Sequence, residues 1–371
     1  MRRIKFCHII DASTANPLLY NSIKHSDRKR FEYKVVSLAP HGVLHSQMAE
    51  LGVDSLDLGY SKRAQAPTAF WRLFQYLKKE RIEIVQTHLF DASLIGLSAA
   101  RLARIPVRIF TGHHSAETPL HGKRMVTWVD GLSPRFLANR TIAPSAQMKE
   151  IFIRDVGVYE EKVAVIPHGF DLEGWRSRAS EGNVRNQLGL GNQLMFLAAG
   201  RLSWTKDYRT MIEGFEASLG ERDDAILAIA GGGDDTLLRS LPAAKRLGDR
   251  LVFLGPRNDI ASVMNACDVF VHTSLAESFG MVYIEAFALG KPLICTPTGI
   301  ARDIVRDGKN GYLVRIGDAA SVSEAVTKIL SDRDRAVEMG AFGCTAADEF
   351  AIETTQAFCD AKYVEWLGKH E

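Results

Sequence analysis

Two acidic residues in the second half of the chain are close in sequence: Glu277 lies in a short polar turn, and Glu285 lies about one turn into the helix predicted after it. The turn, Thr273–Gly280, follows an apolar run at Val269–His272 that predicts a strand, and a helical pattern begins near Met281. Free backbone N–H groups at the start of a helix attract phosphate. Ionised carboxylates accept hydrogen bonds from the paired hydroxyls of a sugar or ribose. We therefore predict that this turn binds a ligand with phosphate and sugar groups.

Two cations follow an earlier predicted strand of the same half. Arg201 and Lys206 come just after the apolar run Leu194–Ala199 and its Gly200. Fixed positive charge at a strand end can hold a diphosphate without a metal ion. For this segment taken alone, the alternative is an ordinary surface loop with solvated cations.

A glycine run, Gly231–Gly233, follows the strand predicted at Ala225–Ala230. Glycine lets a ligand approach backbone N–H groups closely, and this favours a binding turn. The run lacks both the G-x-G-x-x-G spacing and the P-loop lysine, so it predicts neither dinucleotide nor ATP-loop binding. We expect Asp234, next in the chain, to cap a helix.

Apolar β-rich runs alternate with helical patterns along the chain, which is typical of parallel sheets covered by helices. Strands are predicted at Ile4–Ile10, Tyr33–Leu38, Ile84–Thr87, Val107–Thr111, Thr141–Ala143 and Val163–Ile166, and then at Leu194–Ala199, Ala225–Ala230, Leu251–Leu254, Val269–His272, Leu293–Cys295 and Tyr312–Val314. Helices are predicted at Pro67–Lys79, Ala92–Ala103 with Asp91 as N-cap, Tyr208–Ser218, Val282–Leu289 and Ile352–Trp366.

A length of 371 residues favours two domains. A polar stretch interrupts the alternation and predicts a linker at 166–190, between domains at 1–165 and 191–350. Residues 351–371 are expected to form a terminal helix that packs back on the first domain. The fold class is α/β, with two doubly wound Rossmann-like domains facing a cleft, and such sheets bind ligands beyond the carboxyl ends of their strands.

Composition excludes several classes of protein. Hydrophobic residues make up 46% and charged residues 24%, which is ordinary globular usage. No stretch reaches the roughly 18 apolar residues needed to span a bilayer, and the first apolar run turns polar at Asp11 before a signal peptide is complete. The 5 cysteines are scattered without a C-x-x-C pair, so neither a disulfide framework nor a zinc site is predicted. We expect a cytoplasmic location.

Charge is distributed unevenly along the chain. Residues 1–165 carry 24 Lys and Arg against 15 Asp and Glu, whereas residues 166–371 carry 22 against 29. A basic half can attract an anionic membrane surface or a phosphorylated acceptor, and docking of two oppositely charged halves is the alternative. The pairs Lys62-Arg63 and Lys78-Lys79, with Arg81, are candidates for peripheral contact with anionic lipid or are solvated faces. No nucleic-acid motif accompanies the charge, so nucleic acid is not an expected partner.

In their order along the chain, these motifs resemble the donor-binding domain of the retaining glycosyltransferases of the family 4 type, which have the GT-B fold. The motifs are Gly200-Arg201…Lys206, Gly231-Gly232-Gly233, Thr273-Ser274…Glu277-Ser-Phe-Gly…Glu285-Ala-Phe-Ala-Leu-Gly-Lys-Pro and Gly308-Lys-Asn-Gly311. The segment Ile166-Pro-His-Gly-Phe-Asp is similar to the linker of this family. The first half resembles the acceptor-side domain more loosely, at Gln86-Thr87-His88 and at Thr111-Gly-His113-His114.

The resemblance implies transfer of a sugar from a nucleotide-diphosphate sugar to an acceptor hydroxyl, in glycan, polysaccharide or glycolipid synthesis. It further implies retention of the anomeric configuration and no metal or other cofactor. Arg201 and Lys206 would hold the diphosphate, Glu285 the ribose, and Glu277 with the backbone at Phe279, Gly280 and Met281 the transferred sugar. Gly232, Arg257 and Asn258 are further expected donor contacts.

The resemblance also assigns residues of the first half. His113 matches the cleft histidine of the family best, and His114 is the alternative on the acceptor side; a structural role remains open for both. The catalytic set is therefore His113, Glu277, Arg201 and Lys206. Ser13 and Thr14 are expected on the acceptor side, in a turn where family members usually carry a glycine-rich sequence. His88 and His272 are assigned structural roles.

Two other functions stay open at this point. A sugar-nucleotide epimerase or hydrolase would convert the donor without an acceptor. A non-catalytic GT-B scaffold would bind a nucleotide or a partner without turnover.

Overall fold

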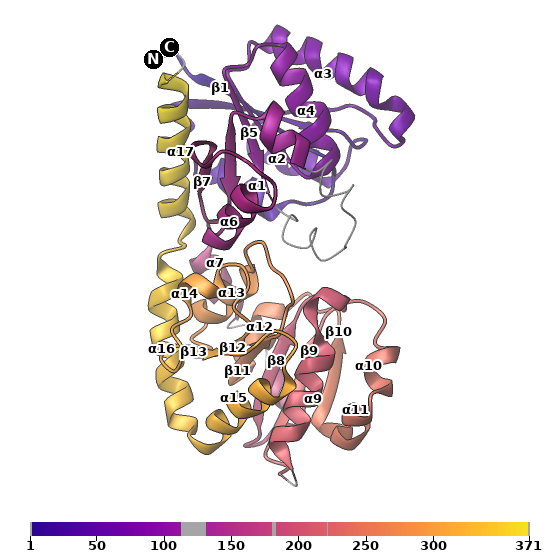
Figure 1. Ribbon diagram of the computed structural model, residues 1–371, viewed down its shortest axis with the longest axis vertical. Helices are drawn as coiled ribbons and strands as arrows, with labels where there is room; N and C mark the ends of the chain where they lie inside the picture. The colour runs from indigo at the N-terminus through magenta and orange to yellow at the C-terminus, as the bar shows by residue number, and fades with distance from the viewer. Residues whose placement is uncertain (1, 113–130, 180–182, 221, 370–371) are drawn as a thin grey trace. The chain divides into compact units, whose positions relative to one another are not determined.

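The computed structural model describes residues 2–112, 131–179, 183–220 and 222–369, which form two compact units. Unit 1 comprises Met1–Phe170 and Ile352–Glu371, and unit 2 comprises Asp171–Ala351 (Figure 1). The break after Phe170 falls within the range 166–190 assigned above to a linker. Among the described residues, no helix has the length and apolar character needed to cross a membrane.

Unit 1 is built on a seven-stranded parallel sheet with the order β3-β2-β1-β4-β5-β6-β7. Its strands are β1 Ile4–Ile10, β2 Phe31–Ser37, β3 Asp54–Asp57, β4 Ile84–His88, β5 Val107–Thr111, β6 Arg140–Ala143 and β7 Val163–Val165. The sequence patterns did not predict β3. It is a four-residue edge strand with two aspartates and no buried residue, so it lacks the apolar run that marks the other strands.

Helices cover both faces of this sheet. The helices of unit 1 are α1 Pro17–His25, α2 Val43–Glu50, α3 Ala66–Glu80, α4 Phe90–Leu102, α6 Ala146–Arg154 and α17 Ile352–Gly368, with short helical turns at η1 Arg63–Gln65, η3 Ser133–Leu137 and η4 Glu160–Lys162. Successive strand residues point to opposite faces, so Phe6 of β1 packs in a core with α1, α2 and α17, while Cys7 packs in a second core with α3 and α4.

The terminal helix α17 is part of unit 1. Its Tyr363 hydroxyl donates to Oε1 of Gln86 in β4 at 2.9 Å, and both Ser26 Oγ and the Asp27 N–H donate to the carboxylate of Asp360. Tyr363 also belongs to the core that α1 and α2 share with the sheet. Burial of this apolar face and the polar contacts together hold α17 on the unit.

Unit 2 contains a six-stranded parallel sheet with the order β10-β9-β8-β11-β12-β13. Its strands are β8 Leu194–Ala199, β9 Ala225–Ala230, β10 Leu251–Gly255, β11 Val269–His272, β12 Leu293–Cys295 and β13 Gly311–Leu313. Its helices are α7 Leu172–Ala179, α8 Val184–Gln187, α9 Tyr208–Leu219, α10 Thr236–Ser240, α11 Pro242–Leu247, α12 Ile260–Ala266, α13 Met281–Ala288, α14 Ala301–Ile304, α15 Ala319–Ser331 and α16 Arg333–Asp348, with turns at η5 Trp204–Lys206 and η6 Gly248–Arg250.

The strand order of unit 2 reverses between β8 and β11, which lie side by side. Chain segments that leave neighbouring strands at such a reversal diverge to opposite faces of the sheet and leave room for a ligand at the carboxyl edge. The loop that carries Lys206 leaves β8, and the loop that carries Glu277 leaves β11. The topology therefore brings these two loops together.

The start of α4 corrects one sequence prediction. Asp91 was predicted as the N-cap, but α4 begins at Phe90 and Asp91 lies in its first turn. The side chain that caps this helix is Asp11, which directly follows β1 and accepts hydrogen bonds from the N–H groups of Asp91, at 3.1 Å, and Ala92. A cap from a residue distant in the sequence satisfies the exposed N–H groups that the local pattern assigned to Asp91.

Candidate functional site

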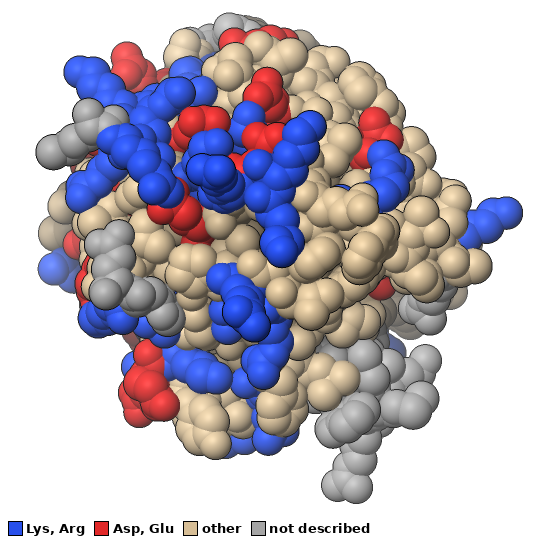
Figure 2. Space-filling model, turned by 90° about the horizontal axis from the view of Figure 1, so that it is seen from above, with Lys and Arg blue, Asp and Glu red and all other residues tan. Residues whose placement is uncertain are grey.

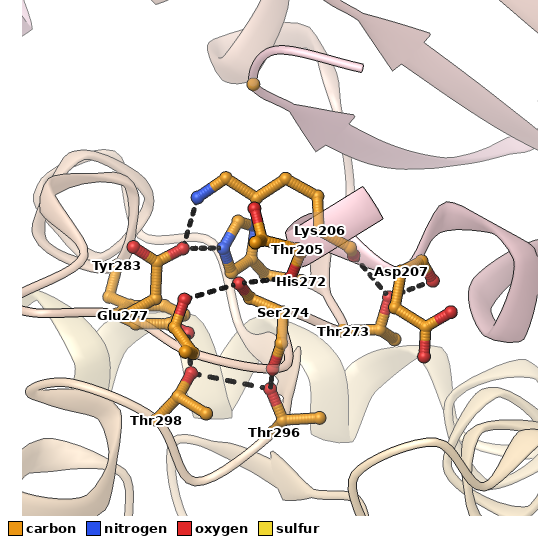
Figure 3. A network of polar contacts seen from close by, with 12 residues as sticks. Thr205, Lys206, Asp207, His272, Thr273, Ser274, Glu277, Tyr283, Thr296 and Thr298 are labelled. Carbon is orange, nitrogen blue, oxygen red and sulfur yellow. Dashed lines mark hydrogen bonds and ion pairs between the residues drawn. The ribbon is translucent and has the colours of Figure 1, made fainter. Parts of the chain in front are cut away.

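Two loops at the carboxyl edge of unit 2 are joined by hydrogen bonds that residues 273–275 donate to the backbone of residues 205–207. The Leu275 N–H donates to the carbonyl of Thr205 at 2.8 Å, and Ser274 Oγ donates to the same carbonyl at 2.9 Å. Thr273 Oγ1 donates to the carbonyl of Asp207 at 2.9 Å (Figure 3). These contacts hold η5, with Lys206 at its end, against the turn that carries Glu277.

Glu277 is the centre of a three-residue polar cluster. Its Oε1 accepts hydrogen bonds from Nζ of Lys206 and from Nε2 of His272, the latter at 2.7 Å (Figure 3). The side chains of Glu277 and Lys206 are 13% and 19% exposed, whereas His272 is buried. Oε2 of Glu277 makes no hydrogen bond to any residue that the structure describes. The cluster therefore fixes one carboxylate oxygen and leaves the other as an acceptor.

The charge state of Glu277 follows from its neighbours. Burial acts to raise the pKa of this carboxyl, but the hydrogen bond from His272 and the charges of His272 and Lys206 outweigh it and lower the pKa to about 2. Glu277 is therefore ionised at neutral pH. An ionised carboxylate only accepts, so Nε2 of His272 carries the proton that it shares.

Helix α13 presents an uncapped N-terminus beside this cluster. Its N-cap, Gly280, has φ +87°, and a Cβ there would lie 2.4 Å from the ring of Tyr283, so this position requires glycine. No side chain caps the helix, and within the described part of the chain the N–H groups of Met281 and Val282 donate to no acceptor. Free N–H groups and the helix dipole favour an anion at this point.

A second layer of contacts supports the turn from below. The Tyr283 hydroxyl lies 3.1 Å from Thr298 Oγ1, and the Ile300 N–H donates to the carbonyl of Phe279 at 2.8 Å. Gly299 has φ +57°, and a Cβ there would lie 2.4 Å from the same carbonyl. The backbone of the loop after β12 therefore packs directly against the turn, which leaves the turn little freedom to move.

Glu285 lies one turn into α13, apart from the three-residue cluster. Its side chain is partly exposed, and burial raises the pKa of its carboxyl to about 7, against the positive charge of Arg178. Its carboxylate makes no hydrogen bond to a described residue. Its backbone carbonyl accepts from Nε1 of Trp175 at 3.1 Å, which fixes this part of the helix to α7.

Arg201 and Arg257 have different surroundings. Arg201 is exposed, and its guanidinium contacts no acceptor among the described residues. Arg257 instead makes a bidentate ion pair with Asp259, at 2.7 and 2.6 Å, and the neighbouring Asn258 is exposed. Of the two arginines predicted to contact a donor, only Arg201 has a guanidinium without a carboxylate partner in the described structure.

The glycine run has a structural role that the sequence prediction did not include. A Cβ on Gly231 would lie 1.8 Å from the carbonyl of Gly200, and one on Gly233, at φ +136°, would lie 2.7 Å from Cβ of Leu202. These two glycines allow the loops after β8 and β9 to pack together. Gly232 is exposed, its carbonyl accepts from the Leu202 N–H at 2.9 Å, and it is the glycine of the run with open space.

Asp234 and His272 show what the sequence patterns predict and miss. Asp234 Oδ1 accepts from the N–H of Thr236, the first residue of α10, at 2.9 Å, close to the capping role predicted for it. His272 was assigned a structural role; its Nε2 hydrogen-bonds Glu277, a contact that the sequence patterns did not predict. His272 is buried, so it acts through Glu277 as a positioning residue. Its place at the end of β11, five residues before Glu277, was the available signal.

Residues predicted on the acceptor side lie in unit 1. Ser13 is partly exposed in the loop between β1 and α1, where its carbonyl accepts from the Leu44 N–H at 2.9 Å, and Thr14 is exposed. His88, at the end of β4, lies with its Nε2 3.1 Å from Nδ1 of the buried His8. His113 and His114 lie outside the described residues.

Two family models match this chain in succession. The model described as Glycosyltransferase Family 4 matches residues 17–173, and the model described as Glycosyl transferases group 1 matches residues 180–343. A UDP-Gal:alpha-D-GlcNAc-diphosphoundecaprenol alpha-1,3-galactosyltransferase from Escherichia coli is 30% identical over 270 residues, which cover 70% of each chain. This chain belongs to the family 4 glycosyltransferases.

Other similarities agree with this assignment. A phosphatidyl-myo-inositol mannosyltransferase from Mycobacterium leprae is 32% identical over 287 residues, which cover 74% of this glycosyltransferase and 72% of the relative. The structure of HepE from Anabaena in complex with UDP has a TM-score of 0.83 at 22% identity, covering 98% of this chain and 100% of that one. The predicted family, the GT-B fold with two Rossmann-like domains and the glycosyltransferase activity are thereby confirmed.

The low pKa of Glu277 predicts how the stability of this glycosyltransferase depends on pH. The folded-state pKa of about 2 lies below the ordinary value of 4.5, so the carboxylate stabilises the fold above pH 4.5 and loses this contribution as pH falls towards 2. We expect Glu277→Gln to lower the free energy of unfolding by about 3 kcal/mol at neutral pH and by progressively less in acid.

Urea unfolding of the wild type and the variant at several pH values measures this difference. Glu213→Gln is the matched control, because Glu213 makes an exposed ion pair with Arg209 that contributes at most about 1 kcal/mol. A difference for Glu277→Gln that stays constant from neutral pH into acid would show that its charge does not stabilise the fold.

Proposed function

We propose that this glycosyltransferase moves a sugar from a nucleotide-diphosphate sugar to a hydroxyl of a glycan or lipid-linked acceptor, with retention of configuration and without a metal ion. The observation that carries the proposal is the cluster of Lys206, Glu277 and His272 beside the uncapped start of α13. It combines a cation and free N–H groups for a diphosphate with a fixed carboxylate for a sugar hydroxyl. The resident groups supply the positive charge that a metal ion would otherwise provide.

Each part of the donor has a complementary group in unit 2. Lys206 has three N–H donors and uses one on Glu277, so two remain for diphosphate oxygens. The exposed guanidinium of Arg201 and the N–H groups at the start of α13 add further donors. Oε2 of Glu277 is left to accept from the transferred sugar, and the carboxylate of Glu285 is left for the ribose hydroxyls.

The proposed reaction needs no carboxylate nucleophile. The acceptor hydroxyl forms a bond to the anomeric carbon on the face from which the diphosphate leaves, and the bond between that carbon and the phosphate oxygen breaks. The leaving oxygen takes the proton of the acceptor hydroxyl. The configuration is retained because the new bond forms on the face from which the diphosphate departs. Lys206 and Arg201 stabilise the charge that develops on the diphosphate, which is commonly the largest contribution of such a site.

The names of relatives suggest the substrate classes. The Escherichia coli relative is named for UDP-Gal and for a sugar linked to diphosphoundecaprenol. For this chain we propose a UDP-hexose donor and an anionic, lipid-linked sugar acceptor. An excess of Lys and Arg over Asp and Glu in residues 1–165, 24 against 15, suits an acceptor that carries a diphosphate.

Turnover measurements test the proposed site. With UDP-hexoses and a polyprenyl-diphosphate-linked sugar as substrates, we expect Lys206→Ala to lower kcat about 100- to 1000-fold, as loss of a transition-state hydrogen-bond donor does in other enzymes. Lys245→Ala removes an exposed lysine of α11 and is the matched control with unchanged kcat. The anomeric signal of the product in an NMR spectrum and turnover in EDTA test retention and metal independence.

Equal turnover in Lys206→Ala and Lys245→Ala would contradict the site assignment. An inverted product would contradict the retaining mechanism, and loss of turnover in EDTA would contradict the absence of a metal.

The raised pKa of Glu285 predicts pH-dependent donor binding. Ribose hydroxyls donate to the ionised carboxylate, so binding favours its deprotonated form and lowers its pKa from about 7. Below pH 7 the dissociation constant of a UDP-hexose should rise about tenfold per pH unit, and above pH 7 it should level off. Calorimetric titration measures this, and Glu285→Gln should abolish the dependence; an unchanged profile in the variant would assign it to another group.

We also propose that Lys62, Arg63 and helix α3 contact an anionic membrane at its cytoplasmic face. Trp71, which is 53% exposed, stacks on Phe74, and Nζ of Lys78 lies 5.6 Å from the centre of the Phe74 ring. These three residues share one face of α3 at helical spacing, and Lys79 and Arg81 follow. Aromatic rings with adjacent cations suit the interface of an anionic bilayer.

Co-sedimentation with vesicles tests this contact. Binding should increase with the fraction of phosphatidylglycerol and fall with added salt, because each cation near the surface contributes about 1 kcal/mol. It should weaken several-fold in Trp71→Ala, because the variant loses the area that the ring buries. Trp204→Ala, which removes an exposed tryptophan of unit 2, is the control. Binding that is independent of anionic lipid, or equal in the two variants, would discard the proposal.

A further inference from the structure

A pocket lies in unit 1, at the edge of the sheet where the strands begin. It has a volume of about 530 Å³ and is lined by Arg101, Arg135, Phe136, Leu137, Gly157, Tyr159 and Lys162. Arg101 lies in the last turn of α4, η3 precedes β6, and Lys162 directly precedes β7. The volume is in the range of pockets that hold small molecules. Ser13 and Thr14, in contrast, follow β1 at the opposite edge.

Three cations converge on this pocket from three different elements, and none of the described residues that line it is acidic. Arg101 donates to the carbonyl of Phe136 at 2.8 Å, and Lys162 donates to the carbonyl of Arg135 at 3.2 Å. These contacts position the cations without neutralising them.

Two carboxylates close to the pocket residues along the chain have other partners, and a third, Glu161, is exposed. Glu160 pairs with Lys149 at 2.8 Å, and Asp155 pairs with Arg154 at 3.0 Å. Within the described structure, no carboxylate pairs with a cation of the pocket. The pocket therefore keeps its positive charge and most of its N–H donors, five for each guanidinium and three for the ammonium.

Two aromatic rings stand exposed at the same pocket. Phe136 is 56% exposed and Tyr159 is 68% exposed. Arg135 lies over the Phe136 ring, 5.1 Å from its centre, and Lys162 lies over the Tyr159 ring at 5.5 Å. Gly157 has φ +76°, and a Cβ added to it would lie 3.4 Å from Cζ of Arg135. The guanidinium therefore packs against the backbone of this glycine. Exposed rings beside cations favour a ligand with both an apolar face and negative charge.

We propose that this pocket binds a saccharide that carries carboxylate or phosphate groups. The C–H face of a pyranose ring packs on an aromatic ring, and guanidinium groups recognise carboxylate and phosphate through paired N–H donors. A flat bilayer would not need cations that converge on a hollow from separate elements, so the pocket favours a discrete ligand. The inference goes beyond the transfer reaction, because the pocket lies at the sheet edge opposite Ser13 and Thr14.

The charge on one face of unit 1 agrees with an anionic ligand. Figure 2 looks onto unit 1 from the side on which β1 begins in Figure 1, and it shows Lys and Arg side chains gathered on part of this face, with fewer acidic ones. Such a field attracts anionic molecules over distances of about a Debye length, roughly 10 Å at 0.1 M salt.

Calorimetric titration of the full chain without a sugar nucleotide tests this inference separately from the proposed function. The probes are tetragalacturonate and mannose 6-phosphate as carboxylated and phosphorylated saccharides, maltotetraose as a neutral one, and inorganic phosphate. We expect one of the two anionic saccharides to bind, maltotetraose not to bind, and phosphate to bind at least tenfold more weakly than that saccharide, because it gains nothing from the rings.

Two variants locate the binding. Arg101→Gln/Arg135→Gln should weaken the bound saccharide at least tenfold, since hydrogen bonds to charged groups are lost. Phe136→Ala, which keeps all the charge, should weaken it several-fold. Lys24→Gln/Lys29→Gln removes the same charge from exposed positions of unit 1 outside the pocket and should leave binding unchanged, as should Lys206→Gln in unit 2.

Three outcomes would overturn the proposal. The first is that neither anionic saccharide binds at millimolar concentration. The second is equal binding in Arg101→Gln/Arg135→Gln and the Lys24→Gln/Lys29→Gln control. The third is loss of saccharide binding in Lys206→Gln, which would place the saccharide in the donor site. If Arg101→Gln/Arg135→Gln lost affinity only for phosphatidylglycerol vesicles, the pocket would be assigned to a membrane contact instead. Unchanged urea unfolding of Arg101→Gln/Arg135→Gln confirms that loss of binding is not loss of fold.

Discussion

The candidate site depends on one carboxylate oxygen that accepts from two donors. Oε1 of Glu277 receives hydrogen bonds from Lys206, which arrives from the loop after β8, and from His272, which ends β11. Both contacts meet at Oε1, so they fix the position of this oxygen. They also hold the ammonium of Lys206 near the start of α13, where an anion would be stabilised by free N–H groups. The side chains of Lys206 and Glu277 thus orient each other through contacts within the chain.

Such an arrangement requires close contact between chain segments that are far apart in sequence. Parallel strands place β8 next to β11, and the loops that leave them join through Thr205, Thr273 and Ser274. Glycine makes the approach possible, because a side chain at Gly231 or Gly299 would overlap a neighbouring backbone carbonyl. The glycine motifs in this half are therefore a consequence of loop packing as much as of ligand binding.

The parts of the structure that were predicted from sequence are those set by burial within a single segment. The sequence predicts β8, β9, β11 and β12 with the bounds observed, because every residue in them is buried and the apolar run is unbroken. The polar edge strand β3 has no such run and was missed. Likewise, the motifs identified Lys206 and Glu277, but not the pairing between them, which depends on how two loops meet.

Asp11 and His272 show why the remaining features were not predictable in the same way. Asp11 caps a helix 80 residues further along the chain, and this contact exists only because β1 and β4 are neighbours in the sheet. His272 is close to Glu277 in sequence, yet a histidine at a buried strand end is equally compatible with a satisfied core residue. Its contact with Glu277 depends on the direction of the turn after β11, which brings Glu277 back to the end of that strand.

The balance of charge in the candidate site has a consequence for the selectivity of the proposed function. Glu277 offsets the charge of Lys206, so of the groups discussed only Arg201 and the α13 N-terminus present uncompensated positive potential. Under the proposed function, a diphosphate alone would meet a moderate field, whereas a sugar diphosphate would also meet the acceptor oxygen of Glu277. Because the attraction would be divided between these groups, the proposal implies that recognition depends on both halves of the donor being present at once. A site built only of cations would bind any polyphosphate and would place the sugar with no particular orientation.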